Sequence, residues 1–303
     1  MAHSHARPAV LESGLVVAAH GRRYRVENAA GSVIECMTRG RKSDIACGDR
    51  VQFAPSGDGG VVEKIEPRRT LFYRSDARRQ KLIAANVTQI VVVIAAEPAY
   101  SEDLVNRCLA GAEHAGIVAA IVFNKVDLPA ATEGMRALHL YRQLGYAVVP
   151  LSAKRDLMPL QAQLARQTSV LVGQSGMGKS TIINGLLPEA AARVAEISTA
   201  LKSGRHTTTH AELYHLGEDS HIIDSPGLQE FGLHHLSSQD AAHAFVEFRP
   251  WLGQCRFRDC VHDAEPGCAI LAAAKRSEIS PVRLSSYPRL IREITRKAAA
   301  WQT

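Results

Sequence analysis

The chain has 303 residues, which suggests two or three modules, and its 46% hydrophobic and 22% charged residues are normal for a globular protein with a sizeable core. The net charge of +6 and the pI of about 9.1 favour an anionic partner, nucleic acid before membrane. Residues 1–8 lack the apolar run of a signal peptide, and the longest strongly apolar stretch, 90–96, is far below the ~20 residues that span a bilayer. We therefore expect a soluble, cytoplasmic monomer with no membrane partner.

Residues 11–65 contain short strand-like runs separated by glycines. Short strands at even spacing predict a small β-barrel, and five of them suit an OB-fold; an unspecialised β-meander is the alternative. The segment that follows, 67–81, is rich in arginine and is interpreted as a basic linker. We expect the barrel and the start of this linker to form an RNA-binding domain over residues 1–75. The five runs are 15–18, 23–26, 32–36, 50–53 and 60–63.

From about residue 89 to 233, compact β-branched runs alternate with helical stretches. This alternation favours a mostly parallel, doubly wound α/β sheet, for which we expect a domain over residues 76–234. After residue 235 the pattern predicts helix, a Cys/His knot and helix again, which gives a third domain over 235–303. The runs of the α/β part are 89–96, 117–123, 147–149, 169–172 and 221–223.

The strongest motif is G-x-x-x-x-G-K-S at residues 173–180, between an apolar strand and a stretch with helical apolar spacing. That context indicates a P-loop, whose backbone N–H groups and helix N-terminus face phosphates; a chance glycine-rich turn is the alternative. Lys179 is expected to bridge the β- and γ-phosphates and Ser180 to bind Mg²⁺. The expected nucleotide contacts here are Gly173, Gln174, Ser175, Gly176, Met177, Gly178, Lys179, Ser180 and Thr181.

A second motif, N-K-V-D at residues 124–127, follows a predicted strand and indicates guanine. The two oxygens of Asp127 match the N1–H and N2–H₂ donors of guanine, whereas adenine presents an acceptor at N1 and no amino group at C2. The Lys125 stem can lie along the base, and Asn124 can tie this loop to the P-loop; an ordinary polar turn is the alternative. The expected contacts are Asn124, Lys125, Val126 and Asp127, with Ser152, Ala153 and Lys154 as the loop behind the base.

The motif D-S-P-G at residues 224–227 predicts the magnesium side of the site. Asp224 is expected to hold Mg²⁺ through water, and the Gly227 N–H to sense the γ-phosphate. The polar stretch 204–209 suits a mobile switch in which Thr208, or Thr207 beside it, completes the Mg²⁺ shell; a plain threonine-rich loop is the alternative.

Leu228 occupies the position where many GTPases carry the glutamine that orients the attacking water. Leucine cannot hydrogen-bond that water, so we expect slow intrinsic hydrolysis unless another group is supplied. His206 in the switch stretch is the candidate for this group, with a solvated surface histidine as the alternative. Arg205 is a second candidate, as a charge-stabilising finger.

The motif order is circularly permuted, because the guanine motif precedes the P-loop, whereas the P-loop comes first in ordinary GTPases. The geometry of the site stays possible, since the termini of α/β domains usually lie close together. The permuted order puts Asp224 and its switch directly before the C-terminal domain. A nucleotide-dependent movement of the switch is therefore expected to act on that domain.

Cys255, Cys260, His262 and Cys268 offer three thiolates and one imidazole, the donor set of a closed, structural Zn²⁺ site. Reduced cysteines in a small core with an incidental histidine are the alternative. Together with the basic residues of the barrel, basic residues after this set favour RNA contact over a merely solvated surface. Those after the set are Lys275, Arg276, Arg283, Arg289, Arg292, Arg296 and Lys297, and those of the barrel are Arg22, Arg23, Arg25, Arg39, Arg41 and Lys42.

These motifs together resemble the family of ribosome small-subunit-dependent GTPase A, RsgA, also called YjeQ or YloQ. The resemblance covers nearly the whole chain, although Met177 stands where a smaller residue such as valine is usual. It implies an OB-fold, a permuted GTPase and a zinc domain, acting in late maturation of the 30S ribosomal subunit. It also implies binding near the decoding region through 16S rRNA, hydrolysis of GTP to GDP when the subunit activates it, and release of another assembly factor.

Two alternatives remain open. One is a permuted GTPase of large-subunit assembly, against which the barrel before the GTPase unit and the Cys/His set after it argue. The other is an RNA-binding module that holds GTP as a structural ligand without turnover. Measuring phosphate release with and without 30S subunits separates a GTPase from a pure binder.

Overall fold

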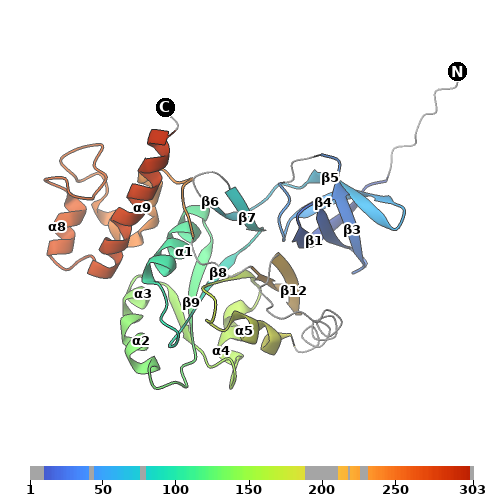
Figure 1. Ribbon diagram of the computed structural model, residues 1–303, viewed down its shortest axis with the longest axis horizontal. Coiled ribbons are helices and arrows are strands. Elements are labelled where there is room, and N and C mark those ends of the chain that lie inside the picture. The colour runs from blue at the N-terminus through green and yellow to red at the C-terminus, as the bar shows by residue number, and fades with distance from the viewer. Residues whose placement is uncertain are drawn as a thin grey trace.

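The computed structural model describes residues 10–40, 44–75, 80–187, 211–217, 219–225 and 231–300, with side chains given up to residue 295. A β-barrel lies at one end of the molecule, an α/β unit in the middle and a helical module at the other end (Figure 1). This three-part architecture confirms the fold class predicted from the sequence. Within the described ranges, no helix has both the length and the apolar character needed to cross a membrane.

The barrel closes because its fourth strand in the chain pairs back with its first. The strand order is β1-β2-β3-β5-β4, and β4 also pairs with β1, from Glu12 opposite Phe53 to Leu15 opposite Arg50. Alternate side chains point inward, so that Tyr24 and Phe53 are buried in a core separate from the rest of the molecule. The strands are β1 (Glu12–His20), β2 (Arg23–Asn28), β3 (Val33–Thr38), β4 (Arg50–Ser56) and β5 (Gly59–Ile65).

The central sheet has the strand order β10-β9-β8-β11-β13-β12, and only β12 runs antiparallel to its neighbour β13 within this set. Every residue of β8 is buried, as expected for a strand covered on both faces. The strands are β8 (Gln89–Ala95), β9 (Val118–Asn124), β10 (Ala147–Pro150), β11 (Thr168–Val172), β12 (Ala211–Gly217) and β13 (Ser220–Asp224). The mostly parallel sheet predicted from the β-branched runs is confirmed.

Helices cover both faces of this sheet, with α1, α2 and α3 on one side and α4 and α5 on the other (Figure 1). Local signals fix the ends of α1: Ser101 caps it by accepting a hydrogen bond from Leu104 N, and Gly116 ends it with φ 65°. The helices are α1 (Glu102–Ala115), α2 (Ala131–Ala137), α3 (His139–Gln143), α4 (Met158–Leu164) and α5 (Lys179–Leu186).

The stretch interpreted from the sequence as a basic linker contains an antiparallel hairpin of β6 (Leu71–Ser75) and β7 (Gln80–Ala85). Its alternating apolar residues bury Phe72 and Ile83, a pattern that the surrounding arginines obscured. One of those arginines, Arg68, is also structural, since its guanidinium donates to both carboxylate oxygens of the fully buried Asp49 at 2.7 and 2.8 Å.

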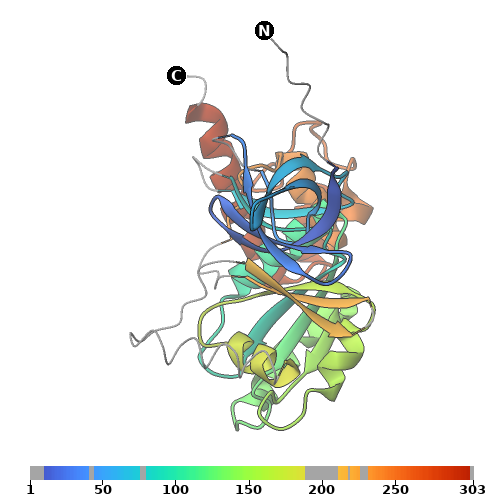
Figure 2. The ribbon, with the colours of Figure 1, turned by 90° about the vertical axis from the view of Figure 1, so that its right-hand side faces the viewer.

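The barrel is joined to the α/β unit by backbone pairing between β1 and β12. Ala18 lies opposite Glu212 and Ala19 opposite Ala211, so that the barrel and the central sheet form one hydrogen-bonded sheet. The hairpin of β12 and β13 therefore lies between the barrel and the other strands of the α/β unit (Figure 2).

The C-terminal module packs against α1 through a small aromatic core. Phe245, Phe248 and Tyr287 are buried, and their ring centroids lie 5.0–5.3 Å apart. A capping box between Ser237 and Asp240 begins the first helix. The elements are α7 (Ser238–Ala244), the 3₁₀ helix η1 (Val246–Trp251), α8 (Ala269–Lys275) and α9 (Pro281–Ala300), with a segment that carries the Cys/His set between η1 and α8.

Candidate nucleotide site and metal centre

The P-loop residues connect β11 to the start of α5, and two glycines make the loop possible. Gly173 and Gly178 have φ 149° and 96°, which favours glycine. A Cβ at Gly173 would lie 2.3 Å from Val93 O, and one at Gly178 would lie 2.2 Å from Asn124 Nδ2. The loop therefore fits closely against β8 and against the guanine motif, and both glycines are required for that fit.

Lys179 folds back over the loop. Its Nζ donates to Gly173 O at 2.7 Å and to Gln174 O at 2.9 Å. Burial lowers the pKa of this ammonium, and the negative charge of Asp224 acts in the opposite direction. A partly desolvated cation at this point provides what a phosphate group needs, since removal from water strengthens its attraction for an anion.

Asp224 reaches the same edge of the sheet as the P-loop because β13 runs parallel to β11. The two strands pair up to Leu171 opposite Asp224, and the next residue, Ser225, donates its hydroxyl to Leu171 O at 2.6 Å. In open parallel sheets, ligands bind at the carboxyl ends of the strands. The exposed Ser180 hydroxyl at the start of α5 and the Asp224 carboxylate therefore offer oxygen ligands suited to Mg²⁺.

Buried Asn124 joins three loops at the end of β9. Its Nδ2 donates to Met177 O in the P-loop at 3.0 Å, and its Oδ1 accepts from Ala153 N at 3.0 Å. The guanine motif, the P-loop and the loop expected behind the base are thus held together by one side chain. This arrangement fixes the distance between the part of the site that would contact the base and the part that would contact the phosphates.

Lys125 and Asp127 are the residues of the guanine motif expected to contact the base. Lys125 has φ 60° and donates its Nζ to Glu97 O at 2.6 Å and to Gly176 O at 2.9 Å, so that its stem crosses toward the P-loop. Asp127 is exposed and accepts a hydrogen bond of 2.6 Å from Ser152, and that hydrogen bond lowers the pKa of the carboxyl. An ionised Asp127 keeps acceptor capacity for the two guanine donors.

The residues with which the sequence predicts hydrolysis fall outside the described part of the chain. These are Arg205, His206, Thr207, Thr208, Gly227 and Leu228. Their roles stay predictions. The structure describes the residues that follow each of the two segments concerned. β12 begins at Ala211, after residues 188–210, and the description continues from Phe231, after residues 226–230.

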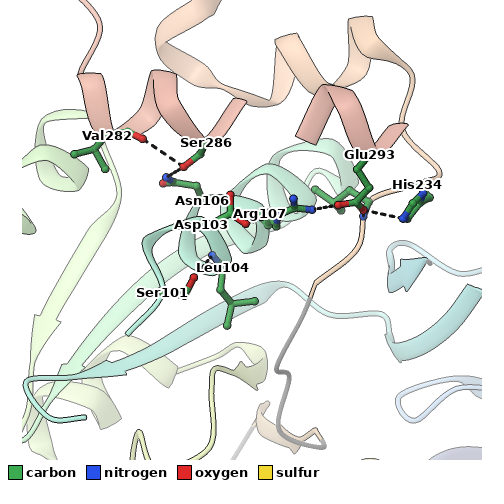
Figure 3. A network of polar contacts seen from close by, with 10 residues as sticks. Ser101, Asp103, Leu104, Asn106, Arg107, His234, Val282, Ser286 and Glu293 are labelled. Atoms are coloured by element: carbon green, nitrogen blue, oxygen red, sulfur yellow. Dashed lines mark hydrogen bonds and ion pairs between the residues drawn. The ribbon is translucent and has the colours of Figure 1, made fainter. Parts of the chain in front are cut away.

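Residues 231–236, which follow residues 226–230, are held by a network of polar contacts that was not predicted from the sequence (Figure 3). Arg107 on α1 pairs with Asp103 at 2.7 Å and with Glu293 on α9. Glu293 Oε1 lies 3.0 Å from His234 Nε2 and accepts from Leu233 N at 3.3 Å. The Glu293 carboxylate on α9 thus contacts both α1 of the α/β unit and residues 231–236. These partners are far apart in the sequence, so no local pattern reveals them.

Arg283 was grouped with the basic residues expected to contact RNA, and the structure contradicts that assignment. Its side chain is fully buried and donates to the two carboxylate oxygens of Glu247 at 2.6 and 3.1 Å and to Asn106 Oδ1 at 3.0 Å. Its guanidinium lies 4.4 Å from the Phe245 ring centroid. Arg283 therefore joins the C-terminal module to α1, because its charge is matched inside the interface.

The Cys/His set forms a compact cluster whose ligand atoms all lie within 4.8 Å of one another. The Sγ atoms of Cys255 and Cys268 are 3.9 Å apart, and each lies 3.5 Å from His262 Nδ1. Tetrahedral Zn²⁺ with ordinary bond lengths requires edges of about 3.8 Å between sulfurs and about 3.6 Å between sulfur and nitrogen. The residues present therefore fit a structural zinc ion.

Hydrogen bonds outside the donor set shape this centre. Glu265 accepts from Val261 N at 2.8 Å, Asp263 N at 3.0 Å and Ala264 N at 3.1 Å. Ala269 N, in the first turn of α8, donates to Cys255 Sγ at 3.4 Å. Such outer contacts orient ligands before a metal binds.

A family model described as RsgA GTPase matches residues 65–234 of the chain. Among curated proteins, the small ribosomal subunit biogenesis GTPase RsgA of Nitrosomonas europaea is 50% identical over 294 residues, covering 95% of this chain and 93% of that protein. The protein of the same name from Ralstonia nicotianae is 49% identical over 292 residues, covering 93% and 92%.

Solved structures agree with this similarity over nearly the full length. YjeQ from Thermotoga maritima superposes with a TM-score of 0.72 at 28% identity, covering 94% of this chain and 99% of that one. YloQ, described as a circularly permuted GTPase, superposes with a TM-score of 0.68 at 27% identity, covering 98% and 99%.

Proposed function

The chain belongs to the RsgA family of GTPases, and we propose that it binds the 30S ribosomal subunit, hydrolyses GTP there and assists late maturation of that subunit, including release of another assembly factor. The observation that carries the nucleotide part is the position of Asn124, which joins the guanine motif, the P-loop and the loop behind the base. A site with these three loops held together suits one ligand that has a base at one end and phosphates at the other.

In this proposal, Asp127 selects guanine and Lys125 covers the base, with Ser152, Ala153 and Lys154 behind it. The P-loop amides hold the phosphates, and Lys179 leaves its carbonyl partners to bridge the β- and γ-phosphates. Ser180, Thr208 and, through water, Asp224 would hold Mg²⁺, which when bound would neutralise charge on the phosphates. Gly227 senses the γ-phosphate.

Hydrolysis is proposed to wait for the subunit. Leu228 offers no hydrogen bond to the attacking water, so intrinsic turnover is slow. His206 is proposed to orient this water once the subunit orders the switch, and Arg205 is the second candidate. Both assignments rest on the sequence.

The other modules are proposed to provide the RNA contacts. The barrel over residues 1–75 and the zinc domain over 235–303 flank the permuted GTPase at 76–234, and both bind 16S rRNA. Cys255, Cys260, His262 and Cys268 hold one structural Zn²⁺, a proposal supported by edges that match a tetrahedral site. The protein is proposed to act as a monomer in the cytoplasm.

Two measurements test the proposal. Phosphate release from GTP should be slow for the protein alone and faster with purified 30S subunits; no release under either condition would leave a GTP-binding module without turnover. Stimulation by 50S but not 30S subunits would instead favour large-subunit assembly.

The base assignment has its own test in Asp127→Asn. This change removes the charged acceptor for two guanine donors, so GTP affinity should fall by about 100-fold. Xanthosine triphosphate should bind the variant better than GTP, because its base presents an acceptor where guanine presents the amino group. Unchanged GTP affinity would contradict the assignment, and Lys179→Ala, which should weaken both nucleotides, is the control.

A further inference from the structure

The zinc-bearing segment presents an aromatic side chain to solvent. Phe257 is 42% exposed, and it is the one aromatic among the exposed large hydrophobic side chains in the described ranges. Its neighbours Arg256 and Arg258 are exposed as well. Single exposed apolar side chains are common on protein surfaces, and what distinguishes Phe257 is its place between two exposed cations.

The ring is held in this position by the architecture of the loop. Cys255 and Cys260, two members of the donor set, lie on either side of it, and Arg256 N donates to Gly267 O at 3.0 Å. A Cβ at Gly267 would lie 2.8 Å from Arg256 Cβ, which shows how closely the two halves of the segment pack. The exposure of Phe257 is therefore a property of a braced loop, and little ordering entropy would be lost when a partner binds.

The charges around the ring indicate which partner fits. The Arg256 guanidinium lies 5.4 Å from the Phe257 ring centroid, and Arg258 adds a second cation, against one acid, Asp259, between Cys255 and Cys260; Asp263 and Glu265 follow later in the loop. Single-stranded RNA combines flat bases, which stack on aromatic rings, with phosphates, which guanidinium groups bind. A protein surface also offers rings and carboxylates, but RNA repeats a flat base and a phosphate at every nucleotide.

We propose that Phe257 is a stacking platform for an unpaired RNA base, with Arg256 and Arg258 binding the phosphates beside that base. This inference rests on the proposed function, since the small subunit is the source of the RNA. The zinc-bearing loop before α8 lies at the end of the molecule opposite the barrel (Figure 1). The platform thus provides a contact with RNA far from any contact made by the barrel.

The experiment measures affinity for purified 30S subunits and for protein-free 16S rRNA over a range of salt concentrations. Phe257→Ala should weaken binding to both by about 5- to 150-fold, the range expected for one stacked base. Phe257→Trp should restore affinity, and Phe257→Leu, which keeps the apolar bulk without a π-face, should not. Arg258→Ala should instead reduce the slope of log K against log salt by about 0.7 to 1.

Val118→Ala, which truncates another exposed apolar side chain, is the matched control and should bind as the unmodified protein does. Zinc content and intrinsic GTP hydrolysis are measured for each variant. If Phe257→Ala loses zinc, the test of stacking rests on Phe257→Leu, which keeps the apolar bulk of the side chain. Unchanged affinity in the leucine variant, or a loss seen with subunits but not with rRNA, would overturn the proposal in favour of packing or of a protein contact. If the unmodified chain binds neither subunit nor rRNA, the proposed function fails as well.

Discussion

Two segments carry the residues predicted to complete the phosphate side of the site, and the described residues that follow each of them form anchors of different strength. After the first segment, 188–210, the chain enters β12, whose link to the barrel includes two paired residues and an ion pair between Arg25 and Glu212 at 2.9 Å. His215 of β12 adds a contact of 2.7 Å between its Nε2 and a carboxylate oxygen of Glu27 in the barrel. The side chains of Arg25 and Glu212 are 44% and 33% exposed. Exposed pairs of this kind contribute about 0–1 kcal/mol, so the link between the first anchor and the barrel is weak, although β12 itself is paired along its length with β13.

After the second segment, 226–230, the chain makes three kinds of contact: an aromatic contact, a backbone hydrogen bond and contacts with Glu293. Phe231 is buried, with its ring 5.2 Å from the Phe72 ring, and Gly232 O accepts from Ser75 N at 2.9 Å. Glu293 binds the next residues from α9, as described above. Buried contacts of this kind separate only at a substantial cost, so the second anchor is strong.

The difference indicates how each outer module responds to the nucleotide. A movement of the second segment must carry α9 and the zinc domain with it or break several buried contacts. A movement of the first segment can be absorbed where β12 meets β1. We therefore expect the C-terminal domain to follow the state of the nucleotide more tightly than the barrel does.

The largest expected effect comes from removing the metal. Zinc provides about 10–16 kcal/mol of apparent binding free energy in small zinc domains, more than the segment 252–268 can replace by packing. Chelation should therefore unfold this segment, which far-ultraviolet circular dichroism and limited proteolysis would detect. Nucleotide affinity should remain, because the loops around Asn124 do not depend on the module; retention of the fold after metal removal would contradict the zinc assignment.

Gly232→Ala tests the strong anchor. The new Cβ would lie 2.2 Å from Ser75 O, so the segment must shift, at a cost of about 1–3 kcal/mol in the free energy of unfolding. Urea denaturation followed by circular dichroism measures this cost. Gly40→Ala, where no atom lies within 4 Å of the new Cβ, is the control and should change stability little.

Glu293→Gln tests the charge in the same anchor. The neutral amide keeps the size of the side chain but loses the ion pair with Arg107 and the carboxylate partner of His234, and we expect a loss of about 1–2 kcal/mol because the groups are only partly exposed. A double-mutant cycle with Arg107→Met separates the pair from other effects. A coupling energy near zero would contradict the importance of this network.

Arg25→Ala should have the smallest effect. It removes the exposed pair with Glu212, and the expected loss is about 0.2–1 kcal/mol, decreasing as salt rises. A double-mutant cycle with Glu212→Gln isolates the pair. A loss as large as that of Glu293→Gln would show that the barrel is attached as firmly as the zinc domain and would remove the contrast between the two anchors.

Features with short sequence spacing could be predicted. The P-loop, the guanine motif and the Cys/His set each place their chemistry within a few residues, and β-branched runs predicted the strands of the central sheet that carry them. Residues that are close in the sequence are brought together by the local backbone, so one sequence is enough to predict that they share a site.

Features that depend on distant partners could not be predicted. Arg283 was grouped with cations expected to contact RNA because Glu247 and Asn106, which offset its burial, lie elsewhere in the chain. Glu293 stands among basic residues near the end of the sequence, and its partners Arg107 and His234 also lie elsewhere in the chain. β12 was missed, and nothing in its own seven residues indicates that β1 of the barrel is its neighbour.

The pairing of β1 with β12 has a further consequence, for self-association. β12 is the outermost strand of the α/β unit on that side, and an open strand edge is a template for pairing with another chain. The barrel covers part of this edge with its own first strand. A chain that lacked the barrel would therefore expose the edge and should tend to aggregate, so that the barrel also serves as a cover that keeps neighbouring molecules apart.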